Sequence, residues 1–265
     1  MINQLVLAFI LSGLVTALAY WRGSLAKSGA AGALLVGTLI YGFGGWIWGV
    51  LLALFFVSSS LLSHYKEGEK QAVAEKFDKG HRRDFSQVMA NGGAGAIFAL
   101  LHAFFPSPLW LPLFVGAMAT VTADTWATEL GTLSKRSPCL ITSGKIVPVG
   151  TSGGISLFGT AVSFTGGLLI GLAAGVLSQN SLLPLTLIGG IGGLLGSLAD
   201  SLLGATIQQI YYCDVCQKET EKKQHCGQPT RPLRGWGWMN NDGVNFLASL
   251  FGGGTAVIIY NILIT

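Results

Sequence analysis

The chain has 265 residues, of which 51% are hydrophobic and 11% are charged, with a mean hydropathy of +0.58 and a formal net charge of +4. Soluble globular domains carry about 25% charged residues, so this composition excludes an ordinary soluble protein. Runs of about 20 apolar residues are typical of helices that cross a bilayer, and such runs recur along the whole chain.

The apolar segments predict an all-α fold, a polytopic integral membrane bundle of about eight transmembrane helices within a range of six to nine. They cover, in chain order, residues 5 to 20, 29 to 43, 44 to 62, 91 to 105, 111 to 130, 154 to 176, 184 to 207 and 243 to 263. The run from 29 to 62 fits either two helices or one long bent helix. The first segment lacks a preceding basic region and a following cleavage site, which indicates a retained helix rather than a signal peptide. Residues 1 to 265 are expected to form a single transmembrane domain.

The positive charges indicate the topology. All 16 Lys and Arg residues lie in four loops, at 21 to 28, 63 to 90, 131 to 153 and 208 to 242. With eight spans these loops share one side of the membrane, and the connections on the other side carry no charge. The positive-inside rule then predicts cytoplasmic loops and outer termini. A count of seven would divide the basic loops between the two faces, which favours eight.

Three acidic residues lie inside predicted helices, whereas the other nine lie in or beside the basic loops. An ionisable group within a bilayer costs at least about 2.5 kcal/mol on insertion scales, so it usually marks a site, a pathway or a buried pair. Asp124, Glu129 and Asp200 are therefore the candidate catalytic residues. Glu129 is nearer the interface than Asp124, and a snorkelling or loop-facing role fits it as well as a catalytic one.

Asp124 and Asp200 share a local pattern, because ADTWATELG and ADSLLGAT both read Ala-Asp-hydroxyl, with Thr125 and Ser201 as the hydroxyl residues. At 1.5 Å per residue each aspartate lies about 10 Å from the cytoplasmic end of its helix. The two carboxylates are thus expected at one depth, where they suit Mg²⁺ and phosphate oxygens. The alternative is that each aspartate only hydrogen-bonds a neighbouring helix.

The stretch GKIVPVGTSGGIS, residues 144 to 156, precedes a helix expected to begin near Gly154. Glycines and hydroxyl residues at a helix start offer N–H and O–H donors to phosphate. The candidate cofactor-binding residues here are Gly150, Thr151, Ser152, Gly153 and Gly154, with Lys135 and Lys145 nearby to neutralise charge. Lys145 precedes the glycines, so this is not a Walker A loop. A flexible, capped turn is the alternative, and the shared face with the aspartate helices favours phosphate binding.

Two further stretches contribute candidates for cofactor binding. HRRDFSQVMANGGAGA, residues 81 to 96, places Arg83 and Asn91 within reach of a polyphosphate, although basic residues here also fit the charge rule or contact with anionic lipid. WMNNDGVNFLAS, residues 238 to 249, places Asn245 one turn into a span, where a ligand contact is expected. Capping of the helix start explains one of the polar residues that precede it.

Cysteines are concentrated in CDVCQKETEKKQHC, where Cys213, Cys216, His225 and Cys226 form a possible zinc hairpin within the cytoplasmic loop 208 to 242. A structural zinc site needs four such ligands. The adjacent His225 and Cys226 reach one metal only with some backbone strain. Free thiols in a reducing cytoplasm are the alternative.

Five motifs together resemble one family. They are ANGGAGAIFAL, ADTWATELG, VGTSGGIS, ADSLLGATIQ and NNDGVNF, in this order over nearly the whole chain. They resemble the signatures of the multi-pass membrane family that includes plant phytyl-phosphate kinase and human transmembrane protein nineteen. The resemblance implies a kinase that transfers a phosphoryl group from a nucleotide, CTP by preference, to an isoprenoid monophosphate in the membrane.

The candidate site residues fit the activity that the resemblance implies. Phosphoryl transfer needs metal to bridge the phosphates and positive charge over the transferred oxygens. Asp124 and Asp200 would hold Mg²⁺, the loop from Gly150 to Gly154 would cradle phosphates, and Lys135, Lys145 or Arg83 would complete a clamp. The partners expected are the isoprenoid phosphate, the nucleotide and the lipid bilayer, with no nucleic acid, and the oligomeric state is left open.

A transporter or lipid translocator is the alternative function, since acids within the membrane and glycine-broken helices are normal there too. A transporter needs polar groups along a path to both faces. The polar residues here crowd toward the cytoplasmic side, which favours the kinase. A CDP-alcohol phosphatidyltransferase is disfavoured, because its spaced run of aspartates is missing.

Overall fold

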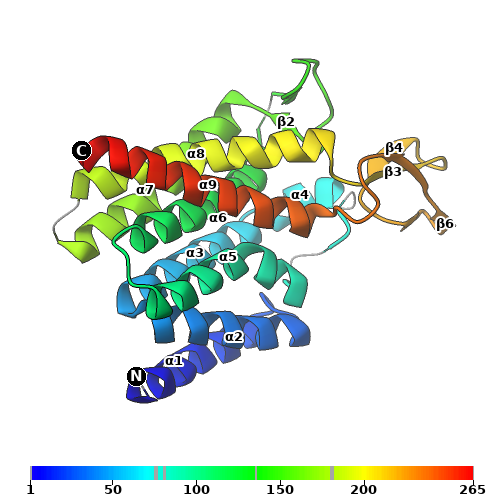
Figure 1. Cartoon of the computed structure of the whole chain (residues 1–265). Helices are drawn as coiled ribbons and strands as arrows, with labels where there is room; N and C mark the ends of the chain where they lie inside the picture. The colour runs from blue at the N-terminus through cyan, green and yellow to red at the C-terminus, as the bar shows by residue number, and fades with distance from the viewer. Residues whose placement is uncertain (1, 75–76, 80–81, 135, 180–181, 265) are drawn as a thin grey trace.

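The computed structural model describes residues 2–74, 77–79, 82–134, 136–179 and 182–264. Within these residues eight helices have 18 to 25 residues and follow the predicted apolar segments in order. They are α1 (Ile2–Trp21), α2 (Lys27–Gly44), α3 (Trp46–His64), α5 (Phe85–Phe104), α6 (Trp110–Gly131), α7 (Leu157–Ser178), α8 (Leu182–Thr206) and α9 (Asn241–Ile264). A short helix, α4 (Glu67–Ala74), lies in the second basic loop. The predicted helical membrane bundle is confirmed (Figure 1).

Five of the described helices are long and apolar enough, by length and composition, to cross a membrane: α1, α3, α7, α8 and α9. Helix α6 is also 22 residues long, but its second half contains Asp124, Glu129 and several threonines. The polar groups that lower its hydropathy are thus the ones that the sequence singled out as a candidate site.

The apolar run from 29 to 62 forms two helices rather than one bent helix. Gly45 separates them with a φ of 90°, a left-handed conformation that glycine adopts without a steric penalty. Its N–H group still donates to the carbonyl of Tyr41 at 2.9 Å. The chain therefore breaks at a single residue, and α3 begins at Trp46.

Small residues let α8 and α9 approach the central helix α6 closely. A Cβ atom at Gly196 or at Gly252 would overlap the side chain of Thr120. Interfaces of this kind are typical of helices in membranes, where small residues permit close backbone contact. Thr120 precedes Asp124 by one helical turn, and Gly196 precedes Asp200 by the same interval. The contact between Thr120 and Gly196 lies one turn before each aspartate, so it supports the expected equal depth of Asp124 and Asp200.

The four basic loops meet at one end of the bundle. Three hydrogen bonds join them: Ala26 N to Arg83 O at 3.0 Å, Asp78 N to Glu221 Oε2 at 3.3 Å, and Arg234 Nη2 to Ser152 O at 3.2 Å. Both chain ends lie at the opposite end of the molecule (Figure 1). This arrangement agrees with the placement of all four loops on one side of a membrane.

Short strands within these loops were not predicted. The third loop contains an antiparallel pair, β1 (Cys139–Leu140) and β2 (Gly154–Ile155). The fourth loop contains β3 (Ile210–Cys213), β4 (Lys218–Thr220), β5 (Gln224–His225), β6 (Gln228–Pro229) and β7 (Arg231–Arg234), in which β3 lies between β4 and β7 and β5 pairs with β6. These five strands extend beyond the helices as a separate lobe (Figure 1). We call residues 208 to 240 the strand module.

Candidate active site

A cavity of about 930 Å³ lies where the loops meet the ends of α5, α6, α8 and α9. The candidate catalytic and cofactor-binding residues from the sequence line it, with two exceptions. Those on its wall are Arg83, Asn91, Asp124, Thr125, Glu129, Gly150, Thr151, Ser152, Gly153, Gly154, Asp200, Ser201 and Asn245. The exceptions are Lys145, which is exposed in the turn before β2 and does not line the cavity, and Lys135, which lies outside the described residues.

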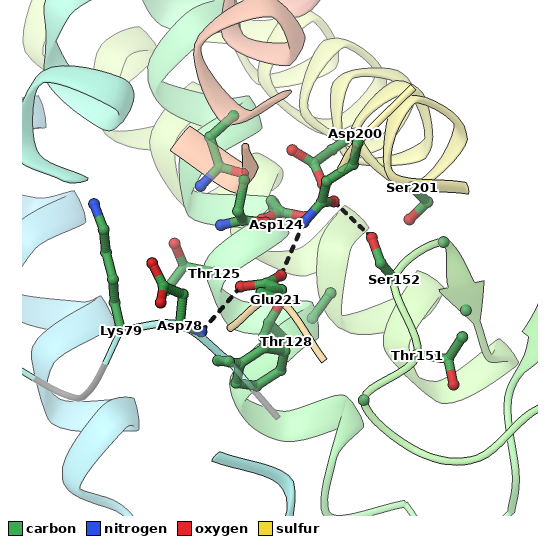
Figure 2. Close-up of a pocket in the computed structure, with 18 of the residues that line it drawn as sticks. Asp78, Lys79, Asp124, Thr125, Thr128, Thr151, Ser152, Asp200, Ser201 and Glu221 are labelled. Carbon is green, nitrogen blue, oxygen red and sulfur yellow. Dashed lines mark hydrogen bonds between the residues drawn. The ribbon is translucent and has the colours of Figure 1, made fainter. Parts of the chain in front are cut away.

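Polar side chains from four helices line a small recess beside this cavity. Asn91 comes from α5, Asp124 from α6, Asp200 from α8 and Asn245 from α9. Figure 2 shows Asp124 and Asp200 directed to the same region, and the two carboxyl groups are close enough to interact electrostatically. The sequence thus identified four groups that the fold brings together from distant segments.

Two oxygen atoms in the recess are buried without a hydrogen-bond partner among the described residues. They are Oδ2 of Asp200 and Oδ1 of Asn245. Buried polar atoms in folded proteins are nearly always hydrogen-bonded, so these two indicate a place for a ligand. Carboxylate and amide oxygens are the ligands that Mg²⁺ and similar hard cations prefer. The residue types of the recess therefore fit a divalent cation, and the metal site stays a prediction.

The glycine-containing loop after β1 is folded against the end of α8. Gly153 has a φ of 85°, and a Cβ atom there would lie 2.8 Å from the backbone nitrogen of Ala205. The Ser152 hydroxyl donates to Gln208 Oε1 at 2.6 Å, and the Thr151 N–H donates to the Pro148 carbonyl. These contacts hold the loop at the cavity wall, close to the helix that carries Asp200.

The helix after this loop begins later than the sequence suggested. The prediction of a helix start near Gly154 is wrong by three residues, because Gly154 pairs in β2 and α7 begins at Leu157. Ser156 is the capping residue, and its hydroxyl accepts the Gly159 N–H at 3.0 Å. The glycines therefore line the cavity as a loop before a strand, not as the first turn of a helix.

Glu129 lies on the cavity wall within an ion pair. Lys70 Nζ donates to Glu129 Oε2 at 2.6 Å, and the Ser63 hydroxyl donates to Oε1 at 2.6 Å. Lys70 is buried and also donates to the Leu62 carbonyl at 2.7 Å. Glu129 thus ties α6 to α3 and α4, and its catalytic role stays a prediction.

Lys79 is a cavity residue that the sequence analysis missed. Its ammonium group pairs with Asp84 at 3.0 Å, donates to Ser86 at 2.6 Å and forms a very short contact with Asp242 at the start of α9. Burial alone would raise the pKa of Asp84, but hydrogen bonds from the Gln87 N–H and from Lys79 outweigh it and hold that pKa below its usual 3.8. This cluster joins the second loop to the starts of α5 and α9.

Arg83 lies beside aromatic rings rather than beside an acid. Its guanidinium group donates to Ser60 Oγ at 3.2 Å and lies 5.8 Å and 5.6 Å from the ring centres of Phe55 and Phe56. Burial lowers the pKa of Arg83, while the charge of Glu129 opposes that change. A half-buried cation on the cavity wall suits an anionic ligand.

The strand module also reaches the cavity, which nothing in the sequence indicated. Glu221 Oε1 accepts from Gln208 Nε2 at 2.8 Å, and Oε2 accepts from the Asp78 N–H at 3.3 Å (Figure 2). Burial raises the pKa of Glu221 above its usual value despite these two donors. Lys222 and Lys223, which follow it, line the cavity too. The module therefore adds both an acid and cations to the wall.

The predicted zinc ligands are also brought together, at the far side of the strand module. One ligand atom from each of Cys213, Cys216, His225 and Cys226 lies within 4.8 Å of all the others. A hydrogen bond from the Cys216 N–H is the main cause that lowers the pKa of Cys213 to about 6. The cluster thus has the residue types and the compactness of a metal site.

A family model covers almost the whole chain: the model described as "Integral membrane protein DUF92" matches residues 10–253. The chain belongs to the DUF92 family. Its membership confirms the resemblance to the membrane family that includes plant phytyl-phosphate kinase and human transmembrane protein nineteen.

Relatives of this DUF92 protein occur in plants and archaea. It is 33% identical to Protein PGR of Arabidopsis thaliana, with 93% of each chain covered. It is 34% identical to the uncharacterized membrane protein MJ0933 of Methanocaldococcus jannaschii, over 88% of this chain and 85% of that one. It is 29% identical to Protein VTE6, chloroplastic, of Arabidopsis thaliana, over 91% of this chain and 66% of that one. No solved structure matches the chain significantly.

Proposed function

We propose that this DUF92 protein is a membrane-embedded isoprenoid-phosphate kinase that transfers a phosphoryl group from a nucleotide to an isoprenoid monophosphate. The observation that carries the proposal is the recess of Asn91, Asp124, Asp200 and Asn245, with its unpartnered carboxylate and amide oxygens. The family relationship to a phytyl-phosphate kinase supports the same chemistry.

The cavity supplies the parts that phosphoryl transfer requires. Enzymes of this class act mainly by positioning and by stabilising charge, with metal ions between phosphate oxygens. Asp124 and Asp200 would hold Mg²⁺, which when bound neutralises charge on the phosphates. Arg83 and the lysines at 222 and 223 add positive charge on the same wall. An acceptor that is itself a phosphate needs no strong general base, so a Ser-His type pair is not required.

The roles of the glycine-containing loop, the phosphoryl donor and the acceptor are proposed on different grounds. The segment from Gly150 to Gly154 lies on the cavity wall beside α8, which supports its role in holding nucleotide phosphates. CTP as the donor rests on the family resemblance alone. The isoprenoid tail of the acceptor would lie among the membrane helices, with its phosphate in the cavity at their ends.

The orientation of the protein in its membrane is also proposed. Three of the four basic loops line the cavity, and the positive-inside rule places such loops in the cytoplasm. The cavity would then open to cytoplasmic nucleotide, and both termini would lie on the outer side.

The direct test measures phosphoryl transfer with purified components. Purified protein in lipid nanodiscs would be incubated with Mg²⁺, a panel of prenyl monophosphates, and CTP, ATP, GTP or UTP labelled in the γ-phosphate. The expected product is a labelled prenyl diphosphate, absent with Asp200→Asn and without Mg²⁺. The absence of transfer for every combination, together with uptake of a prenyl phosphate into sealed vesicles, would instead support the transporter alternative.

A further inference from the structure

We propose that the strand module binds one structural Zn²⁺ through Cys213, Cys216, His225 and Cys226, and that this zinc fixes the module against the cavity wall. The site is separate from the helix recess, and its existence does not depend on the kinase proposal. Two independent features of the module support it, the ligand geometry and the small number of buried side chains in the module.

The ligand atoms already have nearly the spacing of a tetrahedral zinc site. With Zn–S of about 2.3 Å and Zn–N of about 2.0 Å, neighbouring ligand atoms in a tetrahedron lie about 3.5 to 3.8 Å apart. His225 Nδ1 lies 3.4 Å from Cys216 Sγ and 3.2 Å from Cys226 Sγ. All four ligand atoms lie within 4.8 Å of one another, so a small adjustment completes the tetrahedron.

The last two ligands lie at a tight turn, the two-residue hairpin that joins β5 to β6. Cys226 has a φ of 51°, and Gly227 after it has a φ of 74°. A two-residue hairpin of this kind has a positive φ at both central residues. At this turn the thiol of Cys226 lies 3.2 Å from Nδ1 of the preceding His225.

The strand module has little else to hold it together. Its strands are two to four residues long, and few of its side chains are buried, among them Ile210, Cys213 and Thr220. Small units without an adequate core usually need a disulfide or a metal. The four described cysteines of the chain are free, so a metal is the cross-link that these residues favour.

The same strands carry the contacts between the module and the cavity. Strand β4 ends at Thr220, opposite Tyr211 of β3, and Glu221 follows with its bonds to Gln208 and Asp78. On the other side of β3, Arg234 of β7 donates to the Gly204 carbonyl at 2.7 Å and to Ser152 O. Zinc would fix the β3–β4 turn and so position Glu221 and the glycine loop together.

Metal content tests the site directly. Wild-type protein purified without chelators should contain about one Zn²⁺ per chain, and Co²⁺ in its place should give the intense visible bands of tetrahedral thiolate coordination. Cys139→Ser is the matched control, since Cys139 is a free cysteine outside the cluster, and it should retain the zinc. Cys213→Ser with Cys216→Ser should lose it. Wild-type protein without zinc that also fails to take up added Zn²⁺ would overturn the proposal, even if the double variant does not fold.

Hydrogen exchange tests the coupling to the cavity. Removal of zinc from the wild-type protein with a chelator should increase deuterium uptake in residues 208 to 240 and in the glycine loop at 149 to 154. Uptake in α1 and α2, which lie far from the module, should stay unchanged (Figure 1). Unchanged uptake in the module after verified zinc loss would refute the structural role. Neither measurement uses kinase activity, so failure here is distinguishable from failure of the proposed function.

Discussion

The recess between α5, α6, α8 and α9 and the loop cluster around Lys79 line the same cavity but differ in how their polar groups are paired. In the recess, Asp200 and Asn245 keep buried oxygens without partners among the described residues. In the loop cluster, Lys79 bonds both Asp84 and Asp242. Unpaired buried groups indicate ligand binding, whereas paired ones mainly hold elements together. Proximity to a cavity therefore does not by itself assign a role.

The largest effect is expected from charge removal in the recess. Asp124→Asn or Asp200→Asn should lower turnover by about 10³-fold or more, because each removes charge that stabilises the transferring phosphoryl group. The fold should survive, since neutralising a carboxylate in a membrane relieves its desolvation cost. Radiolabelled transfer assays would measure turnover. Glu69→Gln, which removes an exposed charge paired with Lys66, is the control. Normal turnover of the Asp200→Asn variant would refute the proposed catalytic role of Asp200.

A smaller effect is expected at Asn245. Asn245→Ala deletes one of the unpartnered oxygens and should raise the Mg²⁺ concentration needed for half-maximal activity by about 10- to 100-fold, the range known for groups that support a metal. Asn245→Asp keeps an oxygen at this position and should change that concentration less. Titration of activity with Mg²⁺ distinguishes the two. An unchanged Mg²⁺ requirement in Asn245→Ala would place the metal elsewhere.

Glu129 lies on the cavity wall, but its carboxylate is engaged by Lys70 and Ser63. Glu129→Gln leaves the buried Lys70 without its charged partner and should destabilise the protein by about 1 to 3 kcal/mol, less than the loss of a fully buried pair. Activity should fall by no more than about tenfold, far less than for Asp200→Asn. The double variant with Lys70→Met should recover stability in thermal unfolding. A loss of activity as large as that of Asp200→Asn, at unchanged stability, would make Glu129 catalytic.

The smallest effect is expected at Asp84, which caps α5 through the Gln87 N–H. Asp84→Ala should cost about 1 to 2 kcal/mol, and Asp84→Asn, which keeps a capping oxygen, should cost less. The pKa of Asp84 is lowered in the folded protein. Its charge therefore stabilises the fold at pH values above the usual pKa of 3.8, and this stabilisation is lost as the pH falls through the lower pKa of the folded state. Thermal unfolding measured as a function of pH should therefore show that the difference in stability between wild type and Asp84→Asn becomes smaller in acid. A gap that widened in acid would contradict this origin.

The helices could be predicted because each one is a continuous apolar run, and the basic residues between the runs indicated which loops share a side. The break at Gly45 could not be decided from composition, since both a bent helix and two helices bury the same residues. The short strands were missed because strands of two to four residues have too few positions to show an alternation.

In the candidate site, the aspartates were found because an acid in an apolar helix is costly and therefore conspicuous. Lys79 and Asp242 were missed because they meet across 163 residues, and acids and bases in a charged loop have no pattern that reveals such a pair. Glu221 was missed for the same reason. Lys145 was expected at the cavity from its place in the sequence, but the turn before β2 carries it outward into solvent.

Both ends of the chain lie at the end of the bundle opposite the loops (Figure 1). A reporter protein fused to either terminus would stay clear of the cavity. If all eight long helices of the described residues cross the membrane, reporters at the two ends would occupy the same compartment, and the cavity would face the other one. Reporter proteins that are active only outside the cytoplasm, fused to each end, would therefore show from which compartment the cavity takes its substrates. No residue of the site would have to be changed.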